Sequence, residues 1–163
     1  MFHSIEEFLS IWHQESESTL KLFQLLTDAS LSQKVSEEGR SLGRLANHLI
    51  ESLTEMPHKL GLPIEEEQPA LETTAELVAA YQRVNAQFID ALESNWNDDD
   101  LERETNMYGE QWKNGHTLFV IVVHQSHHRG QMTVLMRQAG LKVIGVYGPS
   151  KEEWEEMNIP AMA

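Results

Sequence analysis

Residues 116–140, "HTLFVIVVHQSHHRGQMTVLMRQAG", decide the fold of this chain. The stretch predicts a helix from about His116 to Ala139, because Gly140 is a typical residue to end it. The apolar run Leu118–Val123 inside it is far too short to cross a bilayer. A long helix of this kind has to bury its apolar face against other helices, so we expect a helical bundle.

Three further stretches place apolar residues at helical spacing, over about residues 4–27, 41–60 and 74–95. Each begins with a residue that can cap a helix, namely Ser4, Ser41 and Thr73. Glu residues three positions after Ser4 and Thr73 complete the capping-box pattern. A last short helix is expected over "SKEEWEEM", residues 150–157, which opens with the same pattern.

The connections complete the expected architecture. The segment "GLPIEEEQPALE", residues 61–72, is polar, carries two prolines, and is long enough to cross over one end of a bundle. Residues 95–115 are rich in Asn and Asp and predict an irregular connection, with room for an extended part. Few segments alternate with period two, so no sheet is expected. We therefore predict one all-α domain over residues 1–163, a four-helix bundle with a short C-terminal helix.

Composition excludes several classes of function. The net charge is −14, with only twelve basic residues, and such a surface repels nucleic acids. The first twelve residues show no basic stretch followed by an apolar one, so no signal peptide is expected. The chain contains no cysteine, which fits a reducing compartment and leaves only His, Asp or Glu to hold a metal. We expect a soluble, cytoplasmic protein that binds neither membranes nor nucleic acid.

The histidines in "HQSHHRGQM", residues 124–132, are the main signal of function. His124 and His128 are four residues apart, so on a helix their rings share one face, one turn apart. That face also carries Ile121 and Leu135 and should point into the bundle. The pair predicts a satisfied polar patch, a metal site or an acid–base catalyst, because buried imidazoles are costly unless their nitrogens are used.

His48 favours the metal among these alternatives. It lies in the apolar stripe of the second helix, between Leu45 and Leu49. Alone it would be an ordinary core histidine with a neighbouring partner. Together with His124 and His128 it makes a three-histidine set, which leaves a coordination position open for water or substrate.

His127, Gln131 and Glu51 are candidates for proton transfer or for support of the ligands. His127 is offset from His124 and is expected beside the site or on the surface. Glu51 lies one turn from His48, and an ordinary exposed carboxylate is the simpler interpretation. The remaining histidines are expected outside the site: His3, His13, His58 and His116.

Two neighbours of the histidines also carry predictions. Gly130 in mid-helix costs about 1 kcal/mol relative to Ala, so either another helix approaches closely there or room is needed beside a metal. Arg129 either reaches an acidic side chain or is an ordinary surface cation.

The stretches "HQSHHRGQMTVLMRQAG" and "SLGRLANHLIES" resemble the two histidine motifs of the DinB/YfiT-like family, in the same order and at a fitting distance. The resemblance spans most of the chain. It implies a four-helix bundle with down-up-up-down connectivity, often a homodimer. It also implies a divalent metal, zinc or nickel, on three histidines, which in this sequence are His48, His124 and His128.

Some members of that family resemble transferases that use a low-molecular-weight thiol. Since this chain has no cysteine, the leading hypothesis is an enzyme that adds such a thiol to a small electrophilic substrate. Metal-assisted hydrolysis is the alternative enzyme, and a non-catalytic, metal-stabilised binding module is the alternative outside catalysis. A ferritin-like di-metal bundle is excluded, because the Glu-x-x-His spacing is missing from both histidine helices.

Overall fold

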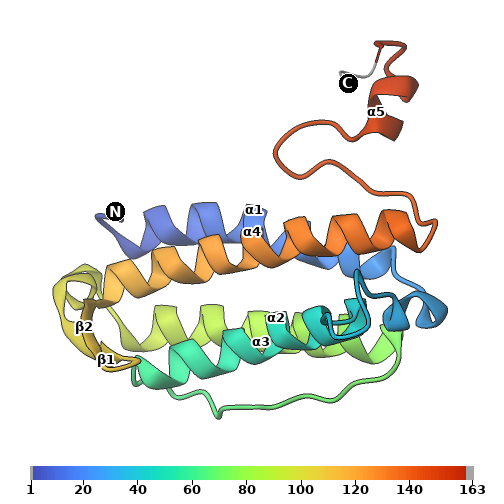
Figure 1. Cartoon of the computed structure of the whole chain (residues 1–163). Helices are drawn as coiled ribbons and strands as arrows, with labels where there is room; N and C mark the ends of the chain where they lie inside the picture. Colours follow the sequence, from blue (N-terminus) through green and yellow to red (C-terminus); the bar gives the residue numbers. More distant parts are fainter. Residues whose placement is uncertain (1, 161–163) are drawn as a thin grey trace.

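The computed structural model describes residues 2–160, so residue 1 and residues 161–163 of the predicted domain lie outside it. Four long helices dominate it (Figure 1): α1 (Ile5–Gln24), α2 (Leu42–Lys59), α3 (Thr74–Asn95) and α4 (Asn114–Gln138). A short helix, α5 (Lys151–Glu156), follows. The all-α class is confirmed, and each helix lies within a few residues of its predicted range.

The helices pack as a four-helix bundle. Both α1 and α2 pack against α3 and α4, which places α1 and α2 at opposite corners. In Figure 1, α1 and α4 run in one direction, and α2 and α3 run in the other. This is the down-up-up-down connectivity that the resemblance implied. Because α2 and α3 are parallel, residues 61–73 must return along the length of the bundle (Figure 1), rather than cross over one end as predicted.

Local chemistry explains where the helices begin and end. The capping boxes predicted for α3 and α5 are both present. Ser4 caps α1 by accepting from the Glu7 amide, but the Glu7 carboxylate accepts from the His3 amide at 2.7 Å. The predicted box at Ser4 is therefore only half formed. Gly61 and Gly140 follow α2 and α4 with φ of +79° and +77°, where a side chain would be strained.

Aromatic residues from α1 and α3 fill the centre of the core. Trp12 stacks on Phe8 with ring centroids 6.0 Å apart and meets Phe88 edge to face at 5.5 Å. All three are fully buried, and such pairs add about 0.5–1.5 kcal/mol each beyond the area they bury. The Trp12 indole donates to Asn85 Oδ1 at 2.9 Å, so its polar atom is also satisfied. This packing gives α2 and α4 a rigid support.

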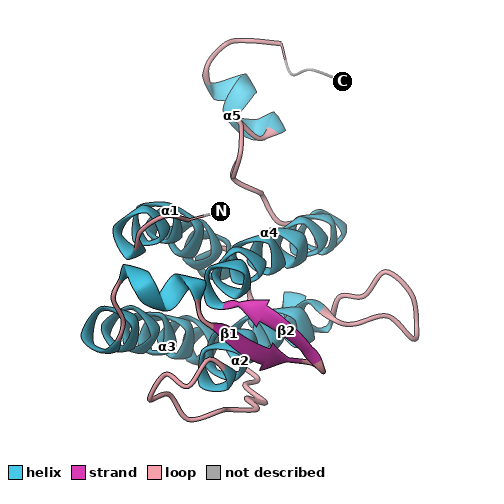
Figure 2. Ribbon diagram, turned by 90° about the vertical axis from the view of Figure 1, so that its left-hand side faces the viewer, coloured by secondary structure: helices cyan, strands magenta, loops and turns pink. Residues whose placement is uncertain are grey.

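The prediction that no sheet forms was wrong. Strands β1 (Glu104–Met107) and β2 (Glu110–Lys113) pair antiparallel, as Figure 2 shows, beside the start of α4. Their two-residue turn, Tyr108–Gly109, has positive φ at both positions. Hairpin turns of this kind usually carry Asn-Gly or Asp-Gly, and the strands are too short and too polar to show an apolar alternation. Two short 3-10 helices, η1 (Asp28–Ser32) and η2 (Asp98–Glu102), were also not predicted.

The C-terminal segment leaves the bundle after α4, and α5 stands away from it in both views (Figures 1 and 2). No residue of α5 is buried. The segment is tied back by Arg137, which pairs with Glu152 at 2.8 Å, and by Tyr147. None of the helices in residues 2–160 has the length and apolar character needed to cross a membrane.

Candidate metal centre

His48 from α2 and His124 and His128 from α4 converge between their helices. One ring nitrogen from each of the three lies within 4.8 Å of the other two. The Nε2 atoms of His124 and His128 are 3.2 Å apart, and the ring centroids of His48 and His128 are 4.7 Å apart. Within residues 2–160, no other three His, Asp or Glu side chains come together this closely. The predicted trio is therefore assembled and can hold a metal ion.

Hydrogen bonds fix which nitrogens face the centre. His48 Nδ1 lies 3.3 Å from Glu51 Oε2, and His128 Nδ1 lies 2.8 Å from Gln131 Oε1. Both oxygens can only accept, so we assign the hydrogen to Nδ1 in both rings and a lone pair to Nε2. The Nε2 of His124 approaches one such lone pair, while its Nδ1 is buried without a partner among the described residues. A divalent ion uses these lone pairs, so the donor set fits a metal.

The histidines are electrostatically ready to act as ligands. Burial is the main reason why the pKa of His124 falls to about 4, and the neighbouring His128 and His48 lower it further. Burial likewise lowers the pKa of His128, although its hydrogen bond with Gln131 acts in the opposite direction. Both rings are therefore neutral at pH 7, and a metal does not have to displace a proton from them.

Glu51 orients His48 instead of standing free in solvent. Its Oε2 contacts His48 Nδ1 and also accepts from Arg44 Nη1 at 3.1 Å. Burial raises the pKa of Glu51, but the hydrogen bonds from His48 and Arg44 outweigh it and hold the pKa below its ordinary value. The interpretation of Glu51 as an ordinary exposed carboxylate was wrong, because a carboxylate on the far nitrogen of a ligand fixes its ring and its basicity.

Gln131 and His127 form a chain of hydrogen-bond contacts that holds the ring of His128. The Gln131 amide binds His128 Nδ1 on one side, and its Nε2 lies 3.1 Å from His127 Nε2 on the other. His127 is exposed, as expected for a residue beside the site. The predicted supporting role of Gln131 thus matches its contacts. Direct catalytic roles for Glu51, His127 and Gln131 remain predictions.

The neighbouring face of α4 carries a buried polar network around Gln125, which was not predicted from the sequence. This side chain is fully buried, and its Nε2 donates to the Leu49 carbonyl of α2 at 3.1 Å. Its Oε1 accepts from the hydroxyl groups of Thr19 in α1 and Tyr81 in α3, at 3.1 and 3.3 Å. Gln125 therefore joins α4 to the other three helices, next to His124. Its position in the apolar stripe, four residues after Ile121, was the available signal.

Arg129 reaches an acidic side chain, as one of its two interpretations predicted. It is buried and pairs with the Glu15 carboxylate of α1. It also donates to the Glu15 carbonyl at 2.7 Å and to the Tyr147 hydroxyl at 2.9 Å. The Tyr147 hydroxyl in turn donates to Glu15 at 2.8 Å, so the C-terminal segment covers this charge pair.

Both explanations predicted for Gly130, a close helix or room beside a metal, were wrong. The residue is exposed, and an added Cβ would meet nothing within 4 Å, so no helix approaches there. It also does not face the metal centre, because it lines a cavity between α4 and residues 143–150.

The other histidines lie outside the site as expected. His13 and His58 bond to backbone carbonyls at 2.6 and 2.8 Å, and His116 packs on Trp112.

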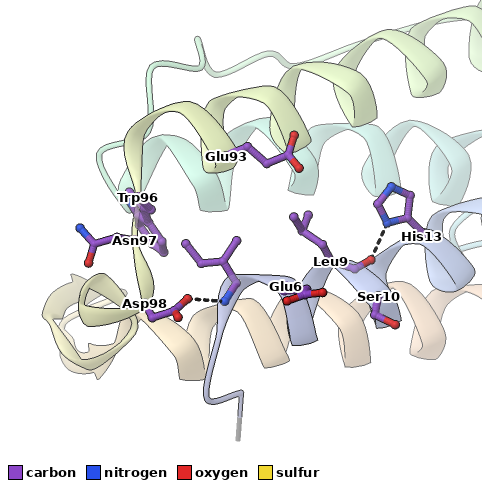
Figure 3. A pocket seen from close by; sticks show the side chains of 9 residues that line it. Glu6, Leu9, Ser10, His13, Glu93, Trp96, Asn97 and Asp98 are labelled. Atoms are coloured by element: carbon purple, nitrogen blue, oxygen red, sulfur yellow. Dashed lines mark hydrogen bonds between the residues drawn. The ribbon is translucent and has the colours of Figure 1, made fainter.

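A cavity of about 450 Å³ opens beside His128. Its lining comes from the segment before α2, from α2 itself and from α4: Val35, Gly39, Arg40, Leu45, His127, His128, Gln131, Val134 and Leu135. A second cavity, of about 580 Å³, lies between α1 and the end of α3 (Figure 3). It is lined by carboxylates, including Glu6 and Glu93, and by none of the three converging histidines. The cavity at His128 includes a member of the trio in its lining and can present a small molecule to the metal centre.

Bundle and site together define a class of helical proteins with an open three-histidine centre. The chain belongs to the DinB family, whose model matches residues 1–162. The uncharacterized protein YrdA of Bacillus subtilis (strain 168) is 40% identical over 165 residues, covering 99% of this chain and 98% of that protein.

Solved structures agree with this assignment. A DinB-like protein from Bacillus cereus ATCC 10987 is 42% identical and superposes with a TM-score of 0.87, covering 90% of this chain and all of that chain. A second DinB-like protein, YjoA from Bacillus subtilis, reaches a TM-score of 0.71 at 18% identity, over 88% of this chain and 99% of that one. At that identity the second likeness concerns the fold alone.

Proposed function

We propose that this chain is a metal-dependent enzyme that transfers a low-molecular-weight thiol to an electrophilic small molecule. The observation that carries the proposal is the convergence of His48, His124 and His128 beside a cavity, with no carboxylate among the converging groups. Three neutral ligands leave the charge of a divalent ion such as zinc or nickel undiminished. When bound, the ion would supply a Lewis acid that favours the thiolate form of a thiol at an open position.

The residues around the centre orient the ligands and exchange protons. Glu51 and Gln131 hold the Nδ1 hydrogens of His48 and His128, so that the lone pairs of both rings keep pointing inward. Because the chain has no cysteine, the attacking sulfur has to arrive with a cofactor. In the reaction the sulfur forms a bond to the electrophilic carbon, and the bond from that carbon to its leaving group breaks. His127 is exposed at the edge of the cavity and is the group we propose to exchange protons with solvent.

The test uses protein purified without a histidine tag, stripped of metal and then reconstituted with zinc or with nickel. An aryl halide and an epoxide serve as electrophiles, each with and without an added thiol. We expect conjugation only when metal and thiol are both present, and none above background in a His124→Ala variant. Turnover in thiol-free buffer would instead support metal-assisted hydrolysis, for which the Glu51 carboxylate that contacts His48 is the candidate base. Metal binding without turnover would favour the binding module.

We propose further that the protein acts as a cytoplasmic homodimer. Supporting this, α1 and α4 lie side by side in the bundle (Figure 1), and each of the two helices exposes large apolar side chains. Ile11, Phe119 and Val123 are each at least 40% exposed. Light scattering on purified protein checks the assembly, and a monomeric mass at micromolar concentration would contradict it.

A further inference from the structure

The cavity beside His128 has a charge unlike that of the rest of the molecule. The chain carries a net charge of −14, yet no Asp or Glu lines this cavity. The cavity drawn in Figure 3 and two others are each lined by several carboxylates. A cavity along the C-terminal segment contains Arg129 and Arg137, but both are paired with glutamates. The surroundings of His128 therefore offer the clearest binding place for a negative group.

Arg40 provides that positive charge. It lies just before Ser41, the residue that caps α2, and it is exposed at the cavity. Most basic residues of the chain pair with a carboxylate, whereas Arg40 makes no ion pair or hydrogen bond with any of residues 2–160. Arg40 and His128 line the same cavity, so a molecule in it can meet the guanidinium and the edge of the metal centre together.

Besides Gly39, His127 and Gln131, the rest of the lining is aliphatic. Val35 comes from the segment before α2, Leu45 from α2, and Val134 and Leu135 from α4. A molecule that occupies this cavity therefore meets a cation, an apolar surface and the edge of the metal centre. A guanidinium is suited to a carboxylate, which it can bind with two parallel hydrogen bonds.

We propose that this cavity binds small carboxylic acids with an apolar chain or ring, and that Arg40 pairs with the carboxylate. The apolar part lies against Leu45 and Val134, which directs the far end of the molecule toward His128. The aliphatic walls suit the electrophilic substrate better than a polar thiol cofactor. This assignment of the far end rests on the proposed function, whereas binding of the acid does not require turnover.

The experiment compares 4-phenylbutyrate with its neutral analogue 4-phenylbutanamide. Both are titrated into tag-free protein with labelled Val and Leu methyl groups, followed by NMR, before and after removal of bound metal. The metal-free sample excludes direct coordination of the carboxylate by the ion. We expect shifts at the methyl groups of Val35, Leu45, Val134 and Leu135, and at least about tenfold tighter binding of the acid.

Matched variants test the role of Arg40. Arg40→Gln should abolish the preference for the acid, and Arg40→Lys should keep part of it. Lys142→Gln is the control, because it removes the same charge from another exposed, unpaired residue outside this cavity. Equal binding of acid and amide, a preference that survives Arg40→Gln, or no saturable shift at these methyl groups would overturn the proposal. Loss of metal binding or of thiol transfer with the preference intact would refute the proposed function alone.

Discussion

The two faces of α4 differ in how their polar side chains are satisfied. On one face, Gln125 and Arg129 find partners on α1, α2, α3 and the C-terminal segment, and among the described residues only the Arg129 Nε and the Thr117 hydroxyl are left without one. On the neighbouring face, the nitrogens of His124 and His128 point at His48 and at each other, and the buried Nδ1 of His124 has no partner among the described residues. Adjacent residues of one helix therefore belong to two different kinds of polar cluster.

This difference distinguishes buried polar side chains that stabilise the bundle from buried polar side chains that can bind a ligand. A buried network whose donors meet acceptors from several helices fixes one arrangement of the bundle. A cluster of imidazole nitrogens that face one another is satisfied only in part, by the contact between His124 and His128, and gains stability when a cation or a ligand enters. The comparison predicts that substitutions on the first face lower the free energy of unfolding, and that substitutions on the second face lower metal affinity.

The largest effect is expected at the buried charge pair. Arg129→Met leaves the Glu15 carboxylate buried without its cation, which should cost about 3–5 kcal/mol of unfolding free energy. Urea denaturation of the metal-free protein measures it. The double variant Glu15→Leu, Arg129→Met removes both charges and should recover much of the loss. An unchanged urea midpoint in the single variant would show that the pair does not anchor α4.

A smaller loss is expected at Gln125. Gln125→Met keeps the size of the side chain but removes the acceptor of the Thr19 and Tyr81 hydroxyls and one donor to the Leu49 carbonyl, so we expect a loss of about 1–3 kcal/mol. The matched control is Gln131→Met on the exposed side of the same helix, which should change stability by about 0.5 kcal/mol or less. Equal losses in the two variants would remove the distinction between the faces.

On the histidine face the readout changes from stability to metal affinity. Glu51→Gln weakens the contact that orients His48 and should lower metal affinity about 10- to 100-fold, with little effect on unfolding. Titration calorimetry with zinc measures this. Glu55→Gln, one turn further along α2, is the control and should leave the affinity unchanged. A wild-type affinity in Glu51→Gln would mean that Glu51 does not support the ligand.

The helices could be predicted from the sequence because period and capping residues are local signals. Thr73 and Glu76 fixed the start of α3, and Gly140 fixed the end of α4. The hairpin could not be predicted, because Tyr108 adopts a positive φ that its residue type rarely takes. The return path of residues 61–73 also could not be predicted, since it depends on α2 and α3 being parallel.

The site also has a part that could be predicted from the sequence and a part that could not. The three histidines were accessible from spacing on α4 and from the apolar stripe around His48, strengthened by the family resemblance. The contact of Glu51 with Arg44 and the place of Arg40 at the cavity were not accessible, because each depends on which side chains from other turns and elements come near. Gly130 is a case in which the prediction failed. The unfavourable free energy of a glycine in mid-helix suggested a close contact with another helix, but the structure has open space there.

The most direct test of the central claim is elemental analysis of protein purified without a histidine tag or a metal column, beside the His48→Ala, His124→Ala and His128→Ala variants. A three-histidine centre predicts about one divalent ion per chain in the wild type and loss of that ion in each variant. No ion in the wild type after reconstitution with several divalent metals, or an ion retained by all three variants, would contradict it. The histidines would then be a buried polar network rather than ligands.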